Sequence, residues 1–234
     1  MQVVESTDFY LRVIKLDFSS RDPELRLQFR ILPMFHIGTE QYYRQVFDQL
    51  RSCHEIIYEG VASKKSNDVT RHYRRFAGNL GLVTQNEVLK MNELPGKLIH
   101  ADFTHETGAE EWRKLRFYDK LKMRVLHPLK MYYYSRNMDR RKLVKEFMPS
   151  AEENWMAYGP LEDEAGSMWN YIITARDNIL RNTVRQKLEQ EGRAEKLIGV
   201  VYGAAHMKVV IRLLIDQYRY VPEKPEFLEV FQVR

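Results

Sequence analysis

Hydrophobic residues along the chain follow two periods, one typical of strands and one typical of helices. Residues 25–31 alternate Leu, Leu, Phe and Ile with Arg, Gln and Arg, which is the two-residue period of a half-exposed strand. Residues 10–18 are also strand-like, and the turn-forming sequence 19–23 (SSRDP) separates the two runs, so we expect an antiparallel hairpin. Residues 163–190 instead place apolar side chains every three or four positions, which predicts a long amphipathic helix.

Two short apolar runs end in glycine turns that open helices. The run 197–201 leads into the turn 203–206 (GAAH), and the run 34–37 leads into the turn 38–41 (GTEQ), which opens a helix predicted over 39–52. Pro33 is expected to interrupt the strand pattern just before the second of these runs. In open α/β sheets, ligands bind at the carboxyl ends of strands. We therefore expect the two turns to face each other across a shared cleft.

Further strands are predicted between and after these turns. Residues 55–61 are strand-like and present Glu59 near their end, and residues 97–102 form another such run that ends in Asp102. The order strand, helix, strand over 34–61 favours a parallel pair joined by a right-handed crossover. The alternation in 227–233 suits a final strand.

The elements together predict an α/β fold with a central mixed β-sheet flanked by helices. Residues 109–190 read as mostly helical, so we expect a single domain over 1–234 with a helical insertion at about 107–192 that covers the cleft.

Composition narrows the class of protein without naming a function. The chain has 234 residues, 44% hydrophobic and 12% aromatic, which suits an ordinary globular protein with a sizeable core. Its net charge is +5 with mixed signs, and its one cysteine, Cys53, excludes an internal disulfide and fits a reducing compartment. No uncharged apolar run approaches the roughly 18 residues that cross a bilayer. The N-terminus lacks the order of a signal peptide, so we expect a cytoplasmic protein.

With these residues assembled, the chain resembles the superfamily that includes TraB, GumN and the Tiki Wnt-directed proteases. The erythromycin esterases and the haem-binding ChaN proteins are its distant relatives. Members have two Gly-x-x-His turns, a glutamate that ends the strand after the first turn, and an Arg-Asp or Arg-Asn pair ahead of the second. Similar positions here are the two glycine turns, Tyr58-Glu59, Arg176-Asp177-Asn178 and Ala101-Asp102.

The first turn departs from the family pattern. Gln41 stands where the family has histidine, and an amide is a poorer ligand for transition metals than imidazole. His36 lies two residues before Gly38, on the same face of the strand, and is the alternative ligand. Either histidine ligation has moved to His36, or the metal site is altered or lost.

The resemblance implies a divalent-metal hydrolase that cleaves an amide (peptide) or ester bond. The implied metal is Mn, Co, Zn or Fe, held by His36, Glu59 and His206, with Glu59 as ligand or general base and Arg176 facing the oxyanion. A metal-free route with Glu59 and His206 as base and acid is the variant that the esterase relatives suggest. The expected catalytic residues are Glu59, Asp102, Arg176, Asp177 and His206. The residues expected to contact substrate are Gly38, Gln41, Tyr42, Tyr202 and Gly203.

Other interpretations of the same residues stay open. Asp102 could cap a helix, Arg176 and Asp177 could form a surface ion pair, and His36 could be a core histidine. A ligand- or haem-binding protein that keeps the fold without catalysis is the second function class. Nucleic-acid binding through the basic aromatic stretches 71–76 and 132–136 is the least favoured, because no nucleic-acid motif accompanies them. The expected partner is a small-molecule or peptide substrate, and a homodimer is compatible with the sequence.

Overall fold

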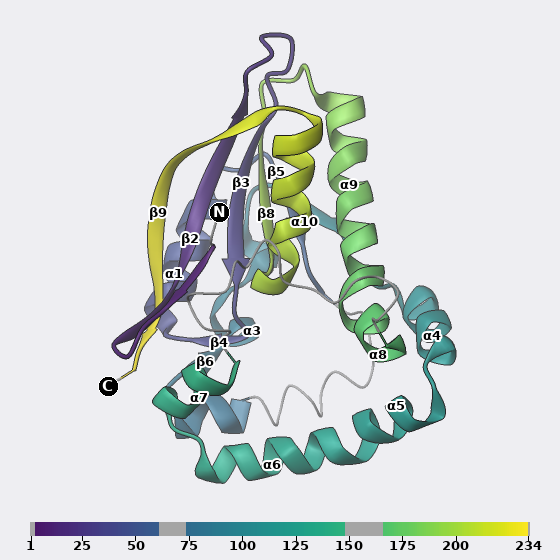
Figure 1. The fold of residues 1–234 in the computed structure, drawn as a ribbon. Coiled ribbons are helices and arrows are strands. Elements are labelled where there is room, and N and C mark those ends of the chain that lie inside the picture. Colours follow the sequence, from purple (N-terminus) through teal and green to yellow (C-terminus); the bar gives the residue numbers. More distant parts are fainter. Residues whose placement is uncertain (1–2, 61–73, 148–165, 234) are drawn as a thin grey trace.

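The computed structural model describes residues 3–60, 74–147 and 166–233. It confirms the predicted class, an α/β fold in which helices flank a mixed central sheet (Figure 1).

Seven strands of the described chain form the central sheet. They are β1 (Val4–Ser6), β2 (Tyr10–Ser20), β3 (Gln28–Met34), β5 (Glu55–Tyr58), β7 (Lys97–His100), β8 (Leu197–Gly203) and β9 (Tyr220–Gln232). The order is β1-β2-β3-β8-β5-β7, with β9 also paired to β2. Strands β3, β8, β5 and β7 are parallel, whereas β1, β2 and β9 pair antiparallel. A separate two-stranded sheet joins β4 (Ile37–Gly38) to β6 (Val83–Thr84).

Helices cover both faces of the sheet. The α-helices are α1 (Glu40–Leu50), α3 (Gln85–Val88), α4 (His105–Lys114), α5 (Phe117–Leu121), α6 (His127–Asn137), α7 (Arg140–Phe147), α8 (Ser167–Trp169), α9 (Ala175–Glu191) and α10 (Met207–Arg212). Residues 122–126, 170–174 and 213–217 form π-helical turns, and residues 91–93 and 204–206 form 3₁₀ turns. Helices α9 and α10 lie on one face of the sheet and α1 lies on the other (Figure 1).

The predicted hairpin is confirmed, but the predicted parallel pair is wrong. Strands β2 and β3 pair antiparallel, for example Leu16 with Ile31. Strands β3 and β5 are parallel and not adjacent, because β8 lies between them and pairs with both. The reason is burial: Ile198 to Tyr202 of β8 are all buried, and a strand that is apolar on both faces takes the centre of a parallel sheet.

Pro33 does not interrupt the strand as predicted. It lies inside β3, opposite Tyr202 of β8, and beyond the last residue of β3 that pairs with β2. At that position β3 has a partner on one side only, so the missing N–H of proline can face the unpaired side.

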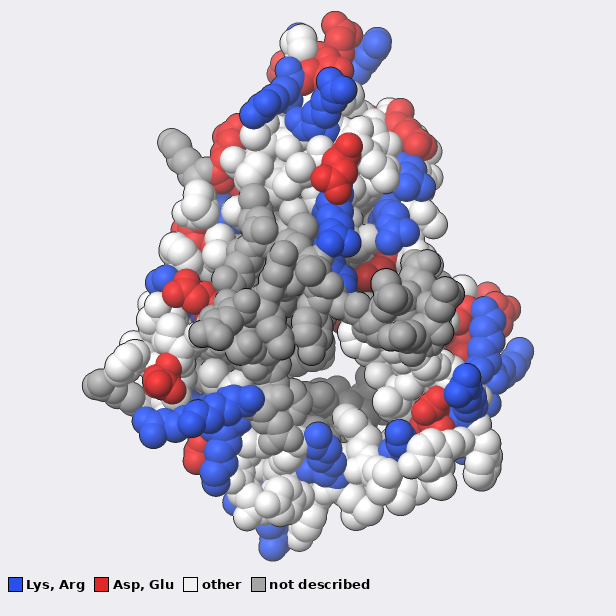
Figure 2. Space-filling view, viewed as in Figure 1, with Lys and Arg blue, Asp and Glu red and all other residues white. Residues whose placement is uncertain are grey.

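The predicted helical insertion is confirmed in the described segments between β7 and β8, which run from α4 to α9. Helix α5, the π-helical turn and α6 follow one another as a single helical rod at the lower edge in Figure 1, and we call residues 117–137 the arm. The space-filling view shows basic side chains along this edge between uncharged ones (Figure 2). No helix within the described ranges has the length and apolarity that a membrane crossing requires.

Candidate active site

Polar side chains gather at one edge of the sheet, where the parallel strands end. Glu59 follows β5, Asp102 lies two residues after β7, and Gly203 ends β8. Parallel strands bring their carboxyl ends to the same edge, which is where sites form in open α/β sheets. Arg176 and Asp177, in the first turn of α9, reach this edge from the helical insertion.

Arg176 is the centre of a buried ion cluster. Its Nε donates to Asp102 Oδ1 (2.9 Å) and its Nη2 to Asp102 Oδ2 (2.8 Å), and Nη2 also donates to Glu59 Oε1. The side chain of Arg176 is 13% exposed and that of Asp102 is fully buried. Burial alone would lower the pKa of Arg176, but the hydrogen bonds to Asp102 and the nearby Glu59 raise it above its ordinary value. The guanidinium is therefore a permanent cation held between two carboxylates.

Backbone amides complete the coordination of both carboxylates. Asp102 accepts from the N–H of Phe103 (2.8 Å) and of Gly60 (3.2 Å). Glu59 Oε2 accepts from the N–H of Gly203 at 2.6 Å. A Cβ atom at position 203 would lie 3.0 Å from Glu59 Oε2, so the glycine permits this close approach.

His206 and Asp177 form a second buried pair beside the cluster. His206 Nδ1 lies 2.7 Å from Asp177 Oδ1, and the His206 side chain is 5% exposed. The ring of Tyr202 packs edge-on against it, with centroids 5.1 Å apart. The other ring nitrogen, Nε2, has no hydrogen bond to any residue that the structure describes. A histidine held through Nδ1 with Nε2 available has the arrangement of a general base.

Tyr202 carries an unsatisfied hydroxyl between the two pairs. Its side chain is fully buried, and its hydroxyl has no hydrogen-bond partner within the described part of the chain. Its ring lies 5.6 Å from the guanidinium carbon of Arg176. Burial raises the pKa of the Tyr202 phenol, Arg176 opposes this rise, and Asp102 and Glu59 add to it. The phenol therefore keeps its proton at neutral pH and can donate a hydrogen bond.

Several residues of the site were missed from the sequence. Tyr171 stacks on Phe103 (5.5 Å between centroids) and meets Trp112 edge-on (5.7 Å), which builds an aromatic wall beside Arg176. Burial raises the pKa of Tyr171; Arg176 opposes the rise and Asp102 adds to it. His100 contacts the carbonyl of Gly60 through Nε2, and its place two residues before Asp102 was the available signal.

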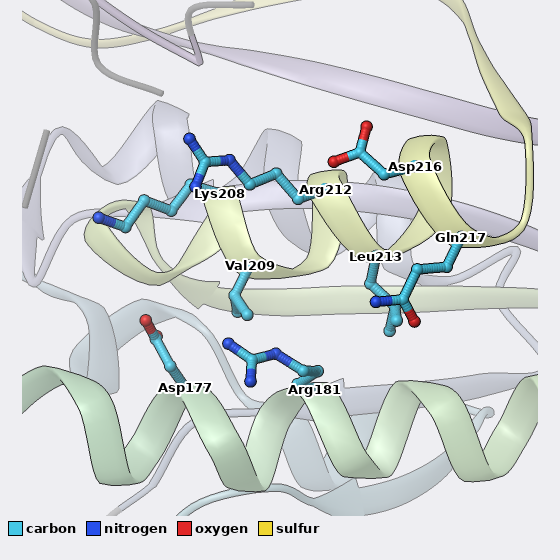
Figure 3. A pocket seen from close by; sticks show the side chains of 8 residues that line it. All are labelled: Asp177, Arg181, Lys208, Val209, Arg212, Leu213, Asp216 and Gln217. Atoms are coloured by element: carbon cyan, nitrogen blue, oxygen red, sulfur yellow. The ribbon is translucent and has the colours of Figure 1, made fainter. Parts of the chain in front are cut away.

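A groove lies between α9 and α10, with Asp177 as one of its lining residues. It has a volume of about 290 Å³, and Arg181, Lys208 and Arg212 line it. Asp177 and Arg181 extend from α9 toward the opposite helix (Figure 3). Burial lowers the pKa of Lys208, Asp177 opposes this effect, and Arg212 adds to it.

The first glycine turn does not join this cluster. Gly38 lies in β4, its position is packed against Tyr42 and Val230, and Thr39 donates its N–H to the Val230 carbonyl (2.8 Å). Gln41 is exposed on α1. Tyr42 is fully buried and donates its hydroxyl to the carbonyl of Pro33 (2.8 Å), which is a contact of the core; its predicted substrate contact stays a prediction.

His36 is exposed at the junction of β3 and β4, which excludes the core reading of this residue. Within residues 3–60, 74–147 and 166–233, no three His, Cys, Asp or Glu side chains are grouped so that they could hold a metal ion. The predicted set His36, Glu59 and His206 is not such a group here. The residues at the site therefore do not fit the predicted three-ligand metal centre.

Comparison with protein-family models, with curated proteins and with solved structures found no match to this chain. The resemblance to the TraB and Tiki superfamily thus rests on the quoted motifs alone and stays a prediction.

Proposed function

We propose that this protein is a hydrolase that cleaves an amide or ester bond, with His206 as its general base. The observation that carries the proposal is the buried His206–Asp177 pair, whose Nε2 is available and which lies beside a buried arginine cluster at the carboxyl edge of the sheet. A base, its orienting carboxylate and a fixed cation are the parts that acyl-transfer chemistry requires.

In the proposed reaction, Nε2 of His206 takes a proton from a water molecule as the water oxygen bonds to the carbonyl carbon of the substrate. Asp177 holds Nδ1 and fixes the tautomer that leaves Nε2 free to accept this proton. The carbonyl oxygen becomes an oxyanion, and the imidazolium then returns the proton to the leaving nitrogen or oxygen as the acyl bond breaks. The products are a carboxylic acid and an amine or alcohol.

Arg176 and Tyr202 are the proposed donors to the oxyanion. Nε and Nη2 of Arg176 are engaged by carboxylates, whereas Nη1 has no hydrogen bond to a described residue. The Tyr202 hydroxyl is buried and has no hydrogen-bond partner among the described residues. A buried polar group without a partner is rare, and the developing oxyanion would accept a hydrogen bond from this hydroxyl as well as from Nη1.

Glu59 and Asp102 are assigned a positioning role. The sequence suggested Glu59 as the base or a metal ligand, but both of its oxygens already accept hydrogen bonds, from Arg176 and from Gly203. Together with Asp102 it fixes the guanidinium in place.

The test is a panel of chromogenic esters and peptide amides assayed with the wild-type chain and with His206→Ala. We expect kcat/KM to fall by roughly 10²-fold or more in the variant, the range typical of losing a general base. His105→Ala is the matched control, because His105 is exposed on α4 and should leave kcat/KM unchanged. Equal activity of His206→Ala and wild type would refute the assignment. Binding of a panel compound without turnover would instead support the ligand-binding protein.

A further inference from the structure

The arm presents an unusually apolar and basic surface to solvent. Tyr118, Leu121, Val125, Leu129 and Tyr132 follow one another at intervals of three or four residues, and each side chain is between 45% and 62% exposed. They run along the helical rod before, within and after its π-helical turn (122–126), and we call them the apolar stripe. A soluble protein rarely leaves a contiguous apolar stripe uncovered without a binding role for it.

The same stretch concentrates positive charge. Residues 113–145 contain twelve Lys or Arg residues against two acidic ones, Asp119 and Asp139. Because the whole chain has a formal net charge of only +5, the rest of the molecule is net acidic. The basic side chains lie close to the rings of the stripe: Lys122 lies 4.6 Å from the ring of Tyr118 and Arg136 lies 4.9 Å from that of Tyr132.

Contacts hold the arm at both ends, and the side chains of its middle are exposed. At one end Ser167 donates to Asp119 (2.5 Å). At the other end Arg140, just beyond the arm, donates to the carbonyls of Leu80 (2.8 Å) and Gln232 (2.9 Å). Side chains 124–130 between these anchors are exposed without exception. The arm therefore projects from the lower edge of the molecule as a fixed element (Figures 1 and 2).

We propose that the arm binds the surface of a bilayer that contains anionic lipids, with the apolar stripe in the interface and the lysines and arginines at the headgroups. An interfacial helix needs these two components, apolar side chains with aromatic neighbours and a flanking set of cations. A groove of about 510 Å³ where the arm meets α7 is lined by Tyr133, Lys142 and Lys145 and offers a place for one lipid phosphate.

The features of the arm favour a bilayer over two other occupants. A second copy of the chain would bring two strongly basic segments together, which like-charge repulsion opposes. Nucleic acid would use the cations and the aromatic rings, but it would leave the aliphatic centre of the stripe (Leu121, Val125 and Leu129) in water. An anionic bilayer offers phosphates to the cations and an apolar interface to both the aromatic and the aliphatic side chains.

The experiment is co-sedimentation of the full-length chain with phosphatidylcholine vesicles, with or without phosphatidylglycerol. We expect binding only when phosphatidylglycerol is present. Arg124→Gln with Lys130→Gln should weaken it roughly fivefold for each cation removed. The matched control, Arg21→Gln with Arg193→Gln, removes the same charge at exposed sites outside the arm and should bind like wild type.

Leu129→Glu tests the apolar half of the proposal. It should reduce vesicle binding on the order of tenfold or more, while circular dichroism and the thermal melt stay unchanged because the side chain is 60% exposed. A fluorophore on Leu129→Cys should shift its emission to the blue on vesicles. Cys53 is buried and should not compete for the label.

Three results would overturn the proposal. One is the absence of sedimentation by folded wild type with phosphatidylglycerol vesicles. The second is tighter binding to double-stranded DNA or RNA than to vesicles, with Leu129→Glu having no effect, which would identify a nucleic-acid surface. The third is a wild-type dimer in solution that Leu129→Glu dissociates, which would identify a second copy as the occupant.

Discussion

Asp102→Asn should destabilise the protein more than the same change at a more exposed aspartate that receives an arginine in a similar two-bond arrangement. Asp102 receives two hydrogen bonds from Arg176 (2.9 and 2.8 Å) with its side chain fully buried. The substitution leaves a cation that is 13% exposed with Glu59 as its one remaining carboxylate partner among the described residues. Removing one partner of a buried ion pair costs about 3–5 kcal/mol. Since Glu59 retains part of the compensation, we expect a loss of about 3 kcal/mol in the free energy of unfolding.

The chain contains its own control for this experiment. Asp17 receives Arg30 in the same two-bond arrangement, Nε to Oδ1 at 2.8 Å and Nη2 to Oδ2 at 3.0 Å, but its side chain is 29% exposed. Asp17 also pairs with Lys15 Nζ (3.0 Å). Solvent screens this more exposed carboxylate, so Asp17→Asn should cost less than Asp102→Asn, about 1 kcal/mol. The comparison therefore sets a fully buried carboxylate against a partly exposed one that pairs with two cations.

Urea unfolding followed by circular dichroism at neutral pH measures both losses. For a chain of this size, a loss of 3 kcal/mol corresponds to a fall in Tm of about 6–12 °C, and the two readouts should agree. A change below about 0.5 kcal/mol for Asp102→Asn, with the denaturant slope unchanged, would refute the reasoning. It would mean that Arg176 finds water or another acceptor when Asp102 is lost.

Three further outcomes are expected. Burial raises the pKa of the Cys53 thiol to about 11, so a maleimide should label native protein slowly at neutral pH and unfolded protein quickly. Hydrogen bonds from Lys187 and Lys196 lower the pKa of Glu191 to about 2. This carboxylate therefore stabilises the fold fully above its ordinary pKa and loses that effect as the pH falls toward about 2. Stability curves of wild type and Glu191→Gln should thus converge in acid, from a difference of about 1 kcal/mol at neutral pH. The proposed mechanism uses no metal step, so ester or amide hydrolysis should continue in the presence of EDTA. Elemental analysis provides the opposing test. Stoichiometric Mn, Co, Zn or Fe in wild type but not in His206→Ala would support the predicted metal centre instead.

Local pattern was enough to predict most elements of the fold. The alternation in residues 25–31, the turn before it and the apolar run that becomes β8 each reflect side chains a few positions apart, which sequence displays directly. Strand order was not predictable in the same way. A period of two tells which side chains share a face, but not that β8 would lie between β3 and β5.

The candidate site was likewise predictable only in part. Glu59, Asp102 and Gly203 come together because each lies at or just after the carboxyl end of a parallel strand, a rule that can be applied to sequence. The aromatic wall could not be foreseen, because Phe103 and Tyr171 are brought into contact only by the path of the helical insertion. The position of the first glycine turn was predicted wrongly, because its local pattern matches that of the second turn. The chain leaves the central sheet after Met34, and residues 37–38 pair with β6 instead.

The arginine cluster also has a consequence for how this edge of the sheet opens. The amides of Gly60, Phe103 and Gly203 follow or end three different strands, and each donates to a carboxylate that Arg176 holds. Their protection from exchange with solvent deuterium should therefore depend on one guanidinium rather than on three separate strand ends. Exchange at the three amides should accelerate together when Arg176 is replaced, so this edge would open as a single cooperative unit.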